Sequence, residues 1–264
     1  MNILLSNDDG VHALGLKLLY KELIKLGKVW VVAPLEEKST TGHSLTLHKP
    51  LRMLEMGKNF YGINGSPADC VYIGLREAMK GKKPDLVVSG INRGANLGQD
   101  VYYSGTVSAA REACILGLPA IAVSLAIDFK NPPKEPKLHY VTAAKLCAQL
   151  IKNLDEIEIP DHTLLNLNVP DKPLSRVKGI AVARQGFRHY SGSVIRRTDH
   201  RGRPYFWVGG QYCGFRNEHD TDCYAVNSSY ASLTPVRLDT TDMSGMKLFS
   251  KLYPPIGNSK RKER

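Results

Sequence analysis

The chain opens with MNILLSNDDG (residues 1–10), a short and nearly unbroken apolar run that ends in two carboxylates and a glycine. Such a run is typical of a strand that is buried on both faces in a parallel sheet. Leucines then recur at helical spacing up to Gly27, which predicts a helix that ends there. A second apolar run, at residues 29–33, ends at Pro34. This strand–helix–strand order predicts a parallel sheet with helical crossovers.

Strand-like and helical segments continue to alternate up to about residue 185. Ser66, Pro67 and Asp69 have the pattern of an N-cap, a first-turn proline and an acidic capping partner, and they predict a helix up to about Met79. Further strands are expected at residues 85–89, 119–124, 164–169 and 180–183, and further helices at 107–117 and 141–154. This order predicts an α/β fold with a mostly parallel sheet and helices on both faces.

The sequence after residue 186 is different in kind. Turn-forming glycines, prolines and aspartates surround the apolar segment 205–208, which predicts strands and long hairpins in place of strand–helix units. We therefore expect a catalytic core over residues 1–186, followed by a hairpin and C-terminal region with a basic tail over residues 187–264. Projecting hairpins of this kind commonly serve contacts between subunits.

The composition is that of a globular chain with an excess of positive charge. The 264 residues include 36 Lys and Arg against 25 Asp and Glu, a net charge of +11, so nucleic acid, a membrane surface or a phosphate-bearing small molecule has to be considered as a partner. Six arginines lie between residues 184 and 203, and the tail at 260–264 is also basic. Five cysteines without a C-x-x-C pair favour reduced thiols and a cytoplasmic location, and no apolar run is long enough for a membrane span.

Polar side chains follow three predicted strands, at the edge where sheets of this kind bind ligands. Asp8 and Asp9 end the first strand and favour a divalent cation with oxygen ligands, although an ordinary Asp-Asp-Gly turn fits these residues too. Ser39 and Asn92 follow two further strands and could add neutral oxygens, or could be ordinary loop and turn residues. His43, in the same loop as Ser39, could donate a proton or contact a substrate.

The segment SGINRGANLGQD (89–100) and the helix start after it suggest an anion site. Its glycines recur at every fourth position, which suggests that the backbone passes close to a ligand. Ser104, Gly105 and Thr106 begin the next helix, where free N–H groups and the helix dipole favour an anion, and where simple N-capping is the alternative explanation. A larger side chain at Gly105 is expected to block that anion and to spare the cation ligands.

Two motifs that are missing from the sequence narrow the chemistry. No G-x-G-x-x-G motif follows the first strand, which disfavours a dinucleotide-binding oxidoreductase. No G-x-x-x-x-G-K-[ST] motif occurs, which excludes P-loop phosphoryl transfer. An acidic metal cluster beside an anion site at a helix start suits metal-assisted hydrolysis of a phosphate ester.

The sequence closely resembles the SurE family of stationary-phase survival proteins, which are metal-dependent 5'-nucleotidases. The matching segments are NILLSNDDG (2–10), GHSLT (42–46), PADCV (67–71), SGINRGANLG (89–98), YSGTV (103–107), NVP (168–170), RGRPY (201–205) and TD (221–222). In this order and spacing the set is specific, and it covers most of the chain. The sequence departs from the family pattern at Ser229 and Ala231, where Gly and Val are usual, and at Ser66, where Thr is more frequent.

The resemblance implies a Rossmann-like core, a protruding C-terminal hairpin region, and a homodimer or homotetramer with exchanged C-terminal elements. It implies release of phosphate from nucleoside monophosphates with one Mg²⁺ or Mn²⁺ ion per subunit. The metal ligands that it implies are Asp8, Asp9, Ser39 and Asn92. The phosphate contacts that it implies are Asn96, Ser104, Gly105 and Thr106.

The sequence therefore predicts a 5'-nucleotidase that hydrolyses nucleoside 5'-monophosphates. Asp8 and His43 are the candidate acceptors of the proton from the attacking water. One alternative is a phosphatase with a non-nucleotide substrate such as polyphosphate. Another is a non-enzymatic nucleic-acid-binding protein, suggested by the positive charge. No membrane partner is expected, and nucleic acid is not the expected partner.

Overall fold

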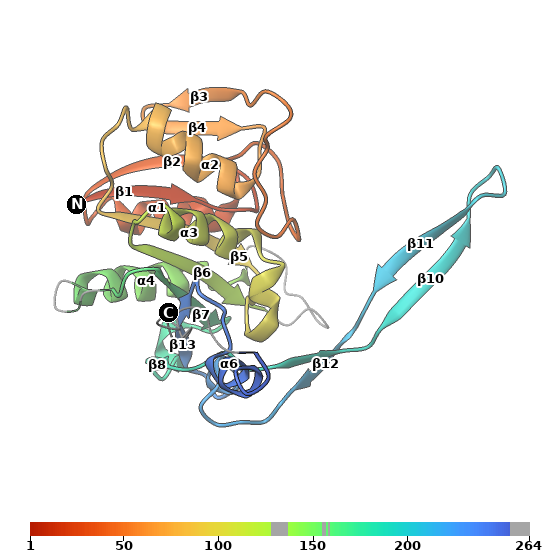
Figure 1. The fold of residues 1–264 in the computed structure, drawn as a ribbon. Coiled ribbons are helices and arrows are strands. Elements are labelled where there is room, and N and C mark those ends of the chain that lie inside the picture. Colours follow the sequence, from red (N-terminus) through yellow and green to blue (C-terminus); the bar gives the residue numbers. More distant parts are fainter. Residues whose placement is uncertain (128–136, 155–156, 158, 254–264) are drawn as a thin grey trace, which may run out of the picture.

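A mostly parallel sheet forms the centre of the computed structural model, which describes residues 1–127, 137–154, 157 and 159–253 (Figure 1). The strands, in chain order, are β1 (Asn2–Ser6), β2 (Lys28–Pro34), β3 (Met53–Gly57), β4 (Phe60–Ile63), β5 (Leu86–Arg93), β6 (Ala120–Ala126), β7 (Thr163–Pro170), β8 (Ile180–Val182) and β13 (Ala231–Arg237). They lie in the order β3-β4-β2-β1-β5-β6-β7-β13-β8. The pairs β3–β4 and β7–β13 are antiparallel, and the other pairs are parallel. The predicted α/β class is confirmed.

Helices cover both faces of this sheet, as the sequence predicts. They are α1 (Leu14–Leu23), α2 (Pro67–Ile73), α3 (Gly105–Ile115) and α4 (Tyr140–Asn153). α1 and α4 pack on one face, and α2 and α3 pack on the other, so that two apolar cores form. The helical spacing of Leu16, Leu19 and Leu23 places all three in the first core, fully buried. Each fully buried leucine side chain contributes roughly 1.5–3 kcal/mol to folding.

The start of α2 has the predicted capping box. The Ser66 hydroxyl accepts a hydrogen bond from the Asp69 N–H (3.1 Å), and the Asp69 carboxylate accepts one from the Ser66 N–H (2.8 Å). After Ile73 the chain continues as the π-helix η1 (Gly74–Ala78). The helical segment therefore ends near Met79, as predicted, although its last part is not α-helical.

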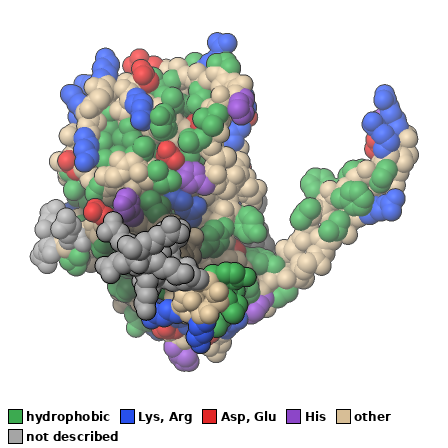
Figure 2. All heavy atoms as spheres, in the orientation of Figure 1, with side chains coloured by type: hydrophobic (Ala, Val, Ile, Leu, Met, Phe, Trp, Pro, Cys, Tyr) green, Lys and Arg blue, Asp and Glu red, His purple; other side chains and the backbone are tan. Residues whose placement is uncertain are grey.

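An antiparallel ribbon leaves the main body after residue 187, which agrees with the hairpins that the sequence predicts. It is built from β9 (Arg188–Tyr190), β10 (Ser193–Thr198), β11 (Pro204–Gly209) and β12 (Tyr212–Phe215), in which β9 pairs with β12 and β10 pairs with β11. We call residues 193–209 the hairpin arm. Figure 1 shows the arm projecting away from the sheet. Apolar side chains run along it, and Lys or Arg side chains gather at its far end (Figure 2).

The rest of the C-terminal region returns to the sheet, which the sequence did not predict. Helix α5 (Asp222–Asn227) leads into β13, which lies between β7 and β8. Helix α6 (Met243–Phe249) follows and exposes Met243, Met246 and Phe249. The basic tail at residues 260–264 lies outside the described residues.

All five cysteines are free thiols, as predicted. Cys213 is exposed, and the other four are buried. Within the described ranges, no helix is long and apolar enough to cross a membrane.

Candidate functional site

The carboxyl ends of β1, β2 and β5 meet at one edge of the sheet, because β1 pairs in parallel with both neighbours. An open cleft with a volume of about 900 Å³ lies at this edge. The predicted site residues that line it are Asp8, Asp9, Ser39, Asn92, Asn96 and Ser104. This is the edge at which open parallel sheets bind their ligands. The three loops therefore bring together the four predicted metal ligands and two of the predicted phosphate contacts.

Asp8 is a buried carboxylate held against the first turn of α3. The Thr106 hydroxyl donates a short hydrogen bond to Asp8 Oδ1. Gly105 packs directly on the same side chain, since a Cβ atom on Gly105 would lie 2.7 Å from Asp8 Cβ. Burial raises the pKa of Asp8 to about 6, and the bond from Thr106 opposes part of that rise.

This packing corrects the expectation that a larger residue at Gly105 would spare the cation ligands. At 2.7 Å an added Cβ atom would force Asp8 or the helix to move. It also shows that the Thr106 hydroxyl is already used by Asp8. Gly105 and Thr106 therefore both help to hold the Asp8 side chain in place, in addition to any contact that they make with an anion.

Asp9 carries the second carboxylate of the pair. Its Oδ2 atom accepts a hydrogen bond from the Arg93 N–H (3.0 Å). Burial and the nearby charge of Asp8 raise the pKa of Asp9 to about 7. Two ionised carboxylates at this position thus repel each other in a poorly solvated place, which favours a cation between them.

Glu37 adds a third negative charge that the sequence analysis missed. It lines the same cleft, and its charge raises the pKa of both Asp8 and Asp9. The Ser39 hydroxyl donates a hydrogen bond to Glu37 Oε1 (2.5 Å). The signal was the pair of glutamates at positions 36 and 37, shortly after the predicted strand end at Pro34 and at the same edge of the sheet as the two aspartates.

In the part of the chain that the structure describes, no three His, Cys, Asp or Glu side chains are grouped closely enough to hold a metal ion by themselves. A cation at Asp8 and Asp9 would therefore also need neutral oxygen ligands. Ser39 and Asn92 are neutral oxygen donors on the same cleft.

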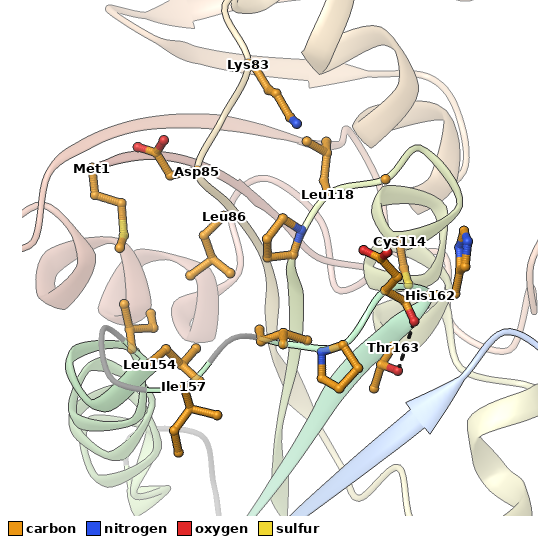
Figure 3. A pocket seen from close by; sticks show the side chains of 16 residues that line it. Met1, Lys83, Asp85, Leu86, Cys114, Leu118, Leu154, Ile157, His162 and Thr163 are labelled. Atoms are coloured by element: carbon orange, nitrogen blue, oxygen red, sulfur yellow. Dashed lines mark hydrogen bonds between the residues drawn. The ribbon is translucent and has the colours of Figure 1, made fainter.

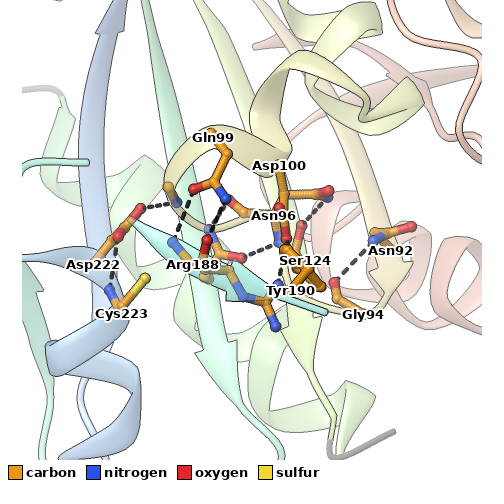
Figure 4. Close-up of polar contacts among 12 residues, drawn as sticks. Asn92, Gly94, Asn96, Gln99, Asp100, Ser124, Arg188, Tyr190, Asp222 and Cys223 are labelled. Atoms are coloured by element: carbon orange, nitrogen blue, oxygen red, sulfur yellow. Dashed lines mark hydrogen bonds and ion pairs between the residues drawn. The ribbon is translucent and has the colours of Figure 1, made fainter. Parts of the chain in front are cut away.

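The loop after β5 is held rigidly over β6 and β7 (Figure 4). The Asn92 amide donates to the Gly94 carbonyl (2.8 Å), which directs Nδ2 away from the role of a ligand and leaves Oδ1 for it. Asn96 donates from its amide to the Ser124 hydroxyl (2.8 Å), and its N–H donates to Asn168 Oδ1 (2.8 Å). The backbone carbonyl of Asn96 accepts from Asn166 and Asn168. These bonds fix Asn96 at the cleft wall.

Ser104 is the N-cap of α3. Its hydroxyl accepts a hydrogen bond from the Val107 N–H (3.0 Å). Ser104 therefore acts as an N-cap, and because it also lines the cleft, the positive end of the α3 dipole lies beside Asp8 at the cleft wall.

His43 lies in the same loop as Ser39 but is not among the described residues that line the cleft. Its Nε2 atom is 2.9 Å from Oε2 of Glu112, a buried residue of α3. The structure thus separates the two candidate proton acceptors: Asp8 lines the cleft, and His43 is paired with Glu112.

A second cavity, of about 420 Å³, lies at the opposite edge of the sheet, where the strands begin (Figure 3). Met1 and Asp85 line it just before β1 and β5, and Leu118, Leu154 and Ile157 supply apolar walls. Because ligands of open α/β sheets bind at the carboxyl ends of the strands, the cleft at Asp8 and Asp9 is the candidate active site.

The arginines between residues 184 and 203 are in part neutralised by neighbouring carboxylates. The ion pairs are Arg184 with Glu218 and Asp220, Arg188 with Asp100, and Arg203 with Asp199. Three of the six arginines are thus paired, which weakens the case for a nucleic-acid surface in this segment.

The fold and the cleft define a Rossmann-like α/β protein with a carboxylate pair at the carboxyl edge of its sheet, a site suited to cation-assisted chemistry on phosphates. The family described as survival protein SurE matches residues 3–192. On this match the chain belongs to the SurE family.

Individual relatives agree with this assignment over nearly the whole chain. A protein named 5'-nucleotidase SurE from Pelobacter propionicus is 44% identical over 250 residues, 95% of this chain and 98% of the relative. A protein of the same name from Legionella pneumophila is 45% identical and covers 96% of each chain. The crystal structure of the Sure protein from Aquifex aeolicus superimposes with a TM-score of 0.82, at 42% identity, over 96% of this chain and 99% of that one.

Proposed function

We propose that this protein is a 5'-nucleotidase, a phosphoric monoester hydrolase that converts nucleoside 5'-monophosphates to nucleosides and inorganic phosphate. The observation that carries the proposal is the carboxylate pair of the buried Asp8 and the half-buried Asp9, which lines a cleft beside the start of α3. The names of the relatives, and family membership over most of the chain, support the same activity.

The cleft offers ligands that fit one divalent ion, Mg²⁺ or Mn²⁺, per subunit. Asp8, Asp9, Ser39 and Asn92 are all oxygen donors, and hard divalent cations prefer such donors. The raised pKa values of the two carboxylates point the same way, because a cation would favour their ionised forms. When bound, the ion would supply positive charge against the phosphate and activate the attacking water.

The protein's own groups would orient the phosphate and handle the proton. We assign Asn96 and the α3 start at Ser104 to the phosphate, because both line the cleft within a rigid framework. Preorganised donors of this kind stabilise the charge that develops in a transition state. Asp8 is better placed than His43 to accept the proton from water, since only Asp8 lines the cleft.

We further propose that the protein acts as a homodimer or homotetramer joined through the hairpin arm. Trp207 lies opposite Ile195 on one face of this two-stranded ribbon, and Val208 lies opposite Val194 on the other. All four are more than half exposed. An isolated two-stranded ribbon is at best marginally stable in water, so burial against a partner would stabilise the arm.

A reducing compartment, the cytoplasm, is the proposed location. The five free cysteines support this location, because disulfides form and persist in oxidising compartments and are rare in the cytoplasm.

A phosphate-release assay tests the activity. The substrates are 5'- and 3'-nucleoside monophosphates and polyphosphate, each with Mn²⁺, with Mg²⁺ and with chelator. We expect release from 5'-monophosphates that chelator abolishes, and we expect Asp8→Asn to remove it while circular dichroism stays unchanged. Asp161→Asn, the same change at the opposite edge of the sheet, is the matched control and should keep full turnover. Chelator-resistant release, or normal turnover by Asp8→Asn, would refute the proposal.

A further inference from the structure

The cleft extends well beyond the carboxylate pair. Its far part is lined by Tyr103, by Tyr190, and by Gly192, Gly209 and Gly210 at the base of the hairpin arm. A phosphate group beside Asp8 would fill only a small part of about 900 Å³. The cleft therefore has room for the rest of a substrate, and this aromatic and glycine-rich wall is one of the surfaces that such a substrate could contact.

Tyr103 is an exposed ring placed directly before the proposed phosphate site. It immediately precedes Ser104, the N-cap of α3, and its side chain is 67% exposed although it lines the cleft. Its backbone is fixed on both sides: the N–H donates to the Asp100 carbonyl (3.0 Å), and the carbonyl accepts from the Gly42 N–H (3.2 Å). The backbone of Tyr103 is thus held in place by hydrogen bonds, while its ring is exposed to solvent.

Tyr190 is a second ring of this wall, and Asp100 joins it to Tyr103. The Tyr190 hydroxyl donates to Asp100 Oδ2 (2.5 Å), while the carbonyl of the same Asp100 accepts from Tyr103. Arg188 pairs with Asp100 Oδ2 (2.5 Å) and lies 4.3 Å above the ring of Tyr212, which in turn contacts Tyr190 with ring centroids 5.9 Å apart. Figure 4 shows Tyr190, Arg188 and Asp100 drawn together beside Asn96. The network fixes the orientation of Tyr190.

We propose that Tyr103 and Tyr190 form a subsite for the nucleobase of the substrate. Aromatic side chains bind the flat faces of bases by stacking, whatever the base, and adjacent glycines allow a flat ring to approach the backbone. The base of the hairpin arm then belongs to the substrate cleft as well as to the arm. This inference rests on the proposed nucleotidase function and specifies which part of the substrate the distal cleft recognises.

The neighbouring tyrosines 102 and 103 provide a matched pair for the test. Both are exposed, at 56% and 67%, but Tyr102 lines a different pocket, with Arg237. The first measurement is the ratio of kcat/KM for adenosine 5'-monophosphate to kcat/KM for ribose 5-phosphate, which lacks the base. We expect Tyr103→Ala to lower this ratio about tenfold through KM, and Tyr103→Phe and Tyr102→Ala to keep it.

The second measurement does not depend on turnover. Adenosine, which has no phosphate to lose, is titrated calorimetrically into the Mn²⁺-loaded protein. Tyr103→Ala and Tyr190→Leu should each weaken adenosine binding about tenfold, and Tyr190→Phe, which keeps the ring, should weaken it less. Unchanged adenosine affinity in Tyr103→Ala and Tyr190→Leu would overturn the subsite. A wild-type protein that binds adenosine but releases no phosphate from any monophosphate would overturn the proposed function alone.

Discussion

Gly105 lies so close to Asp8 that a methyl group on Gly105 would be 2.7 Å from Asp8 Cβ and 2.9 Å from Asp8 Oδ2. The first turn of α3 and the end of β1 therefore form one packed unit, and the proposed phosphate and cation ligands cannot be altered separately at this point.

Gly105→Ala tests this coupling. We expect Mn²⁺ affinity and turnover to fall together by at least tenfold, because Asp8 must move, with a loss of about 1–3 kcal/mol in unfolding free energy from overpacking. Calorimetry, phosphate release and urea unfolding give the three values. Gly117→Ala is the control at the other end of α3, where the space is open and φ is +72°: it should cost stability through backbone strain and leave Mn²⁺ binding intact. Normal Mn²⁺ affinity in Gly105→Ala would contradict the packing argument.

Thr106 should act through Asp8 and not only through phosphate. Thr106→Val keeps the shape of the side chain but removes the donor to Asp8 Oδ1, so unfolding free energy should fall by about 1–3 kcal/mol and Mn²⁺ affinity should fall with it. Thr106→Ser keeps the hydroxyl and should restore most of both values. If Thr106→Val weakens phosphate inhibition but leaves Mn²⁺ affinity and stability unchanged, the hydroxyl serves the phosphate alone.

Asp9→Asn should stabilise the protein in chelator while abolishing turnover. The pKa of Asp9 is raised from 3.8 to about 7 in the folded, metal-free chain, because burial and Asp8 disfavour its charge. A raised carboxyl pKa means that this group favours folding fully below about pH 4 and that the contribution is lost as the pH rises to about 7. The variant escapes that loss, so its Tm in EDTA should exceed the wild-type Tm more at pH 8 than at pH 5.

The same experiment with Mn²⁺ in place of EDTA provides the contrast. Wild-type Tm should rise with the ion, because a ligand that binds only the folded state stabilises it, and Asp9→Asn should gain little. An Asp9→Asn protein that is less stable than wild type in EDTA at pH 8 would show that the carboxylate pair is not under repulsion.

Asp222 should be a major anchor of the hairpin base. This fully buried carboxylate accepts hydrogen bonds from the N–H groups of Gly98, Gly186 and Cys223, at 2.8, 2.8 and 2.7 Å (Figure 4). In Asp222→Asn the side chain keeps its shape, but an NH₂ group replaces one of the two carboxylate oxygens that accept these hydrogen bonds. We expect this change to lower the free energy of unfolding by about 3 kcal/mol. Asp220→Asn, at an exposed ion pair, is the control and should change little. Equal effects of the two changes in urea unfolding would contradict the anchor role.

The hairpin arm offers a separate prediction about assembly. Replacing Phe206 and Trp207 with lysine should reduce the molar mass measured by light scattering to that of a smaller assembly or monomer, because their apolar surface would no longer favour contact with a partner. Arg197→Gln changes the charge of the same ribbon and should leave the mass unchanged. A double lysine variant with the parent mass would exclude the arm as the main contact.

The sequence predicted the elements whose signals are local. β1, β2, β5, β6 and β7 each stand out as apolar runs between turns, and their parallel order follows from the helices between them. β3 was missed because its short sequence, MLEMG, has Glu55 among its apolar residues and so forms no unbroken apolar run, in keeping with the exposure of all five residues. β13 was missed because it contains Pro235, which disfavours an interior strand. The structure shows why a proline is tolerated in this interior strand. β8 has only three residues and pairs with residues 231–233, so it does not reach Pro235.

In the site, too, the residues marked by local sequence could be predicted, and those that depend on tertiary contacts could not. Asp8, Asp9, Ser39 and Asn92 could be predicted together because they lie at or after the carboxyl ends of three neighbouring parallel strands, β1, β2 and β5, whose order brings those ends to one edge. The partners of these residues could not be predicted, because they come from tertiary packing. Thr106 meets Asp8 across 98 residues of sequence, and Glu112 meets His43 across 69. No local pattern in the chain marks either contact.

The distance in sequence between Asp8 and Thr106 also has a consequence for biosynthesis. Asp8 is synthesised before α3, and Thr106 is made 98 residues after it. At 5–20 residues per second this interval is about 5–20 s, during which the first turn of α3 is not available to pack against Asp8. The Asp8 carboxylate therefore lacks its hydrogen bond from Thr106 until α3 has been synthesised and has docked on the sheet.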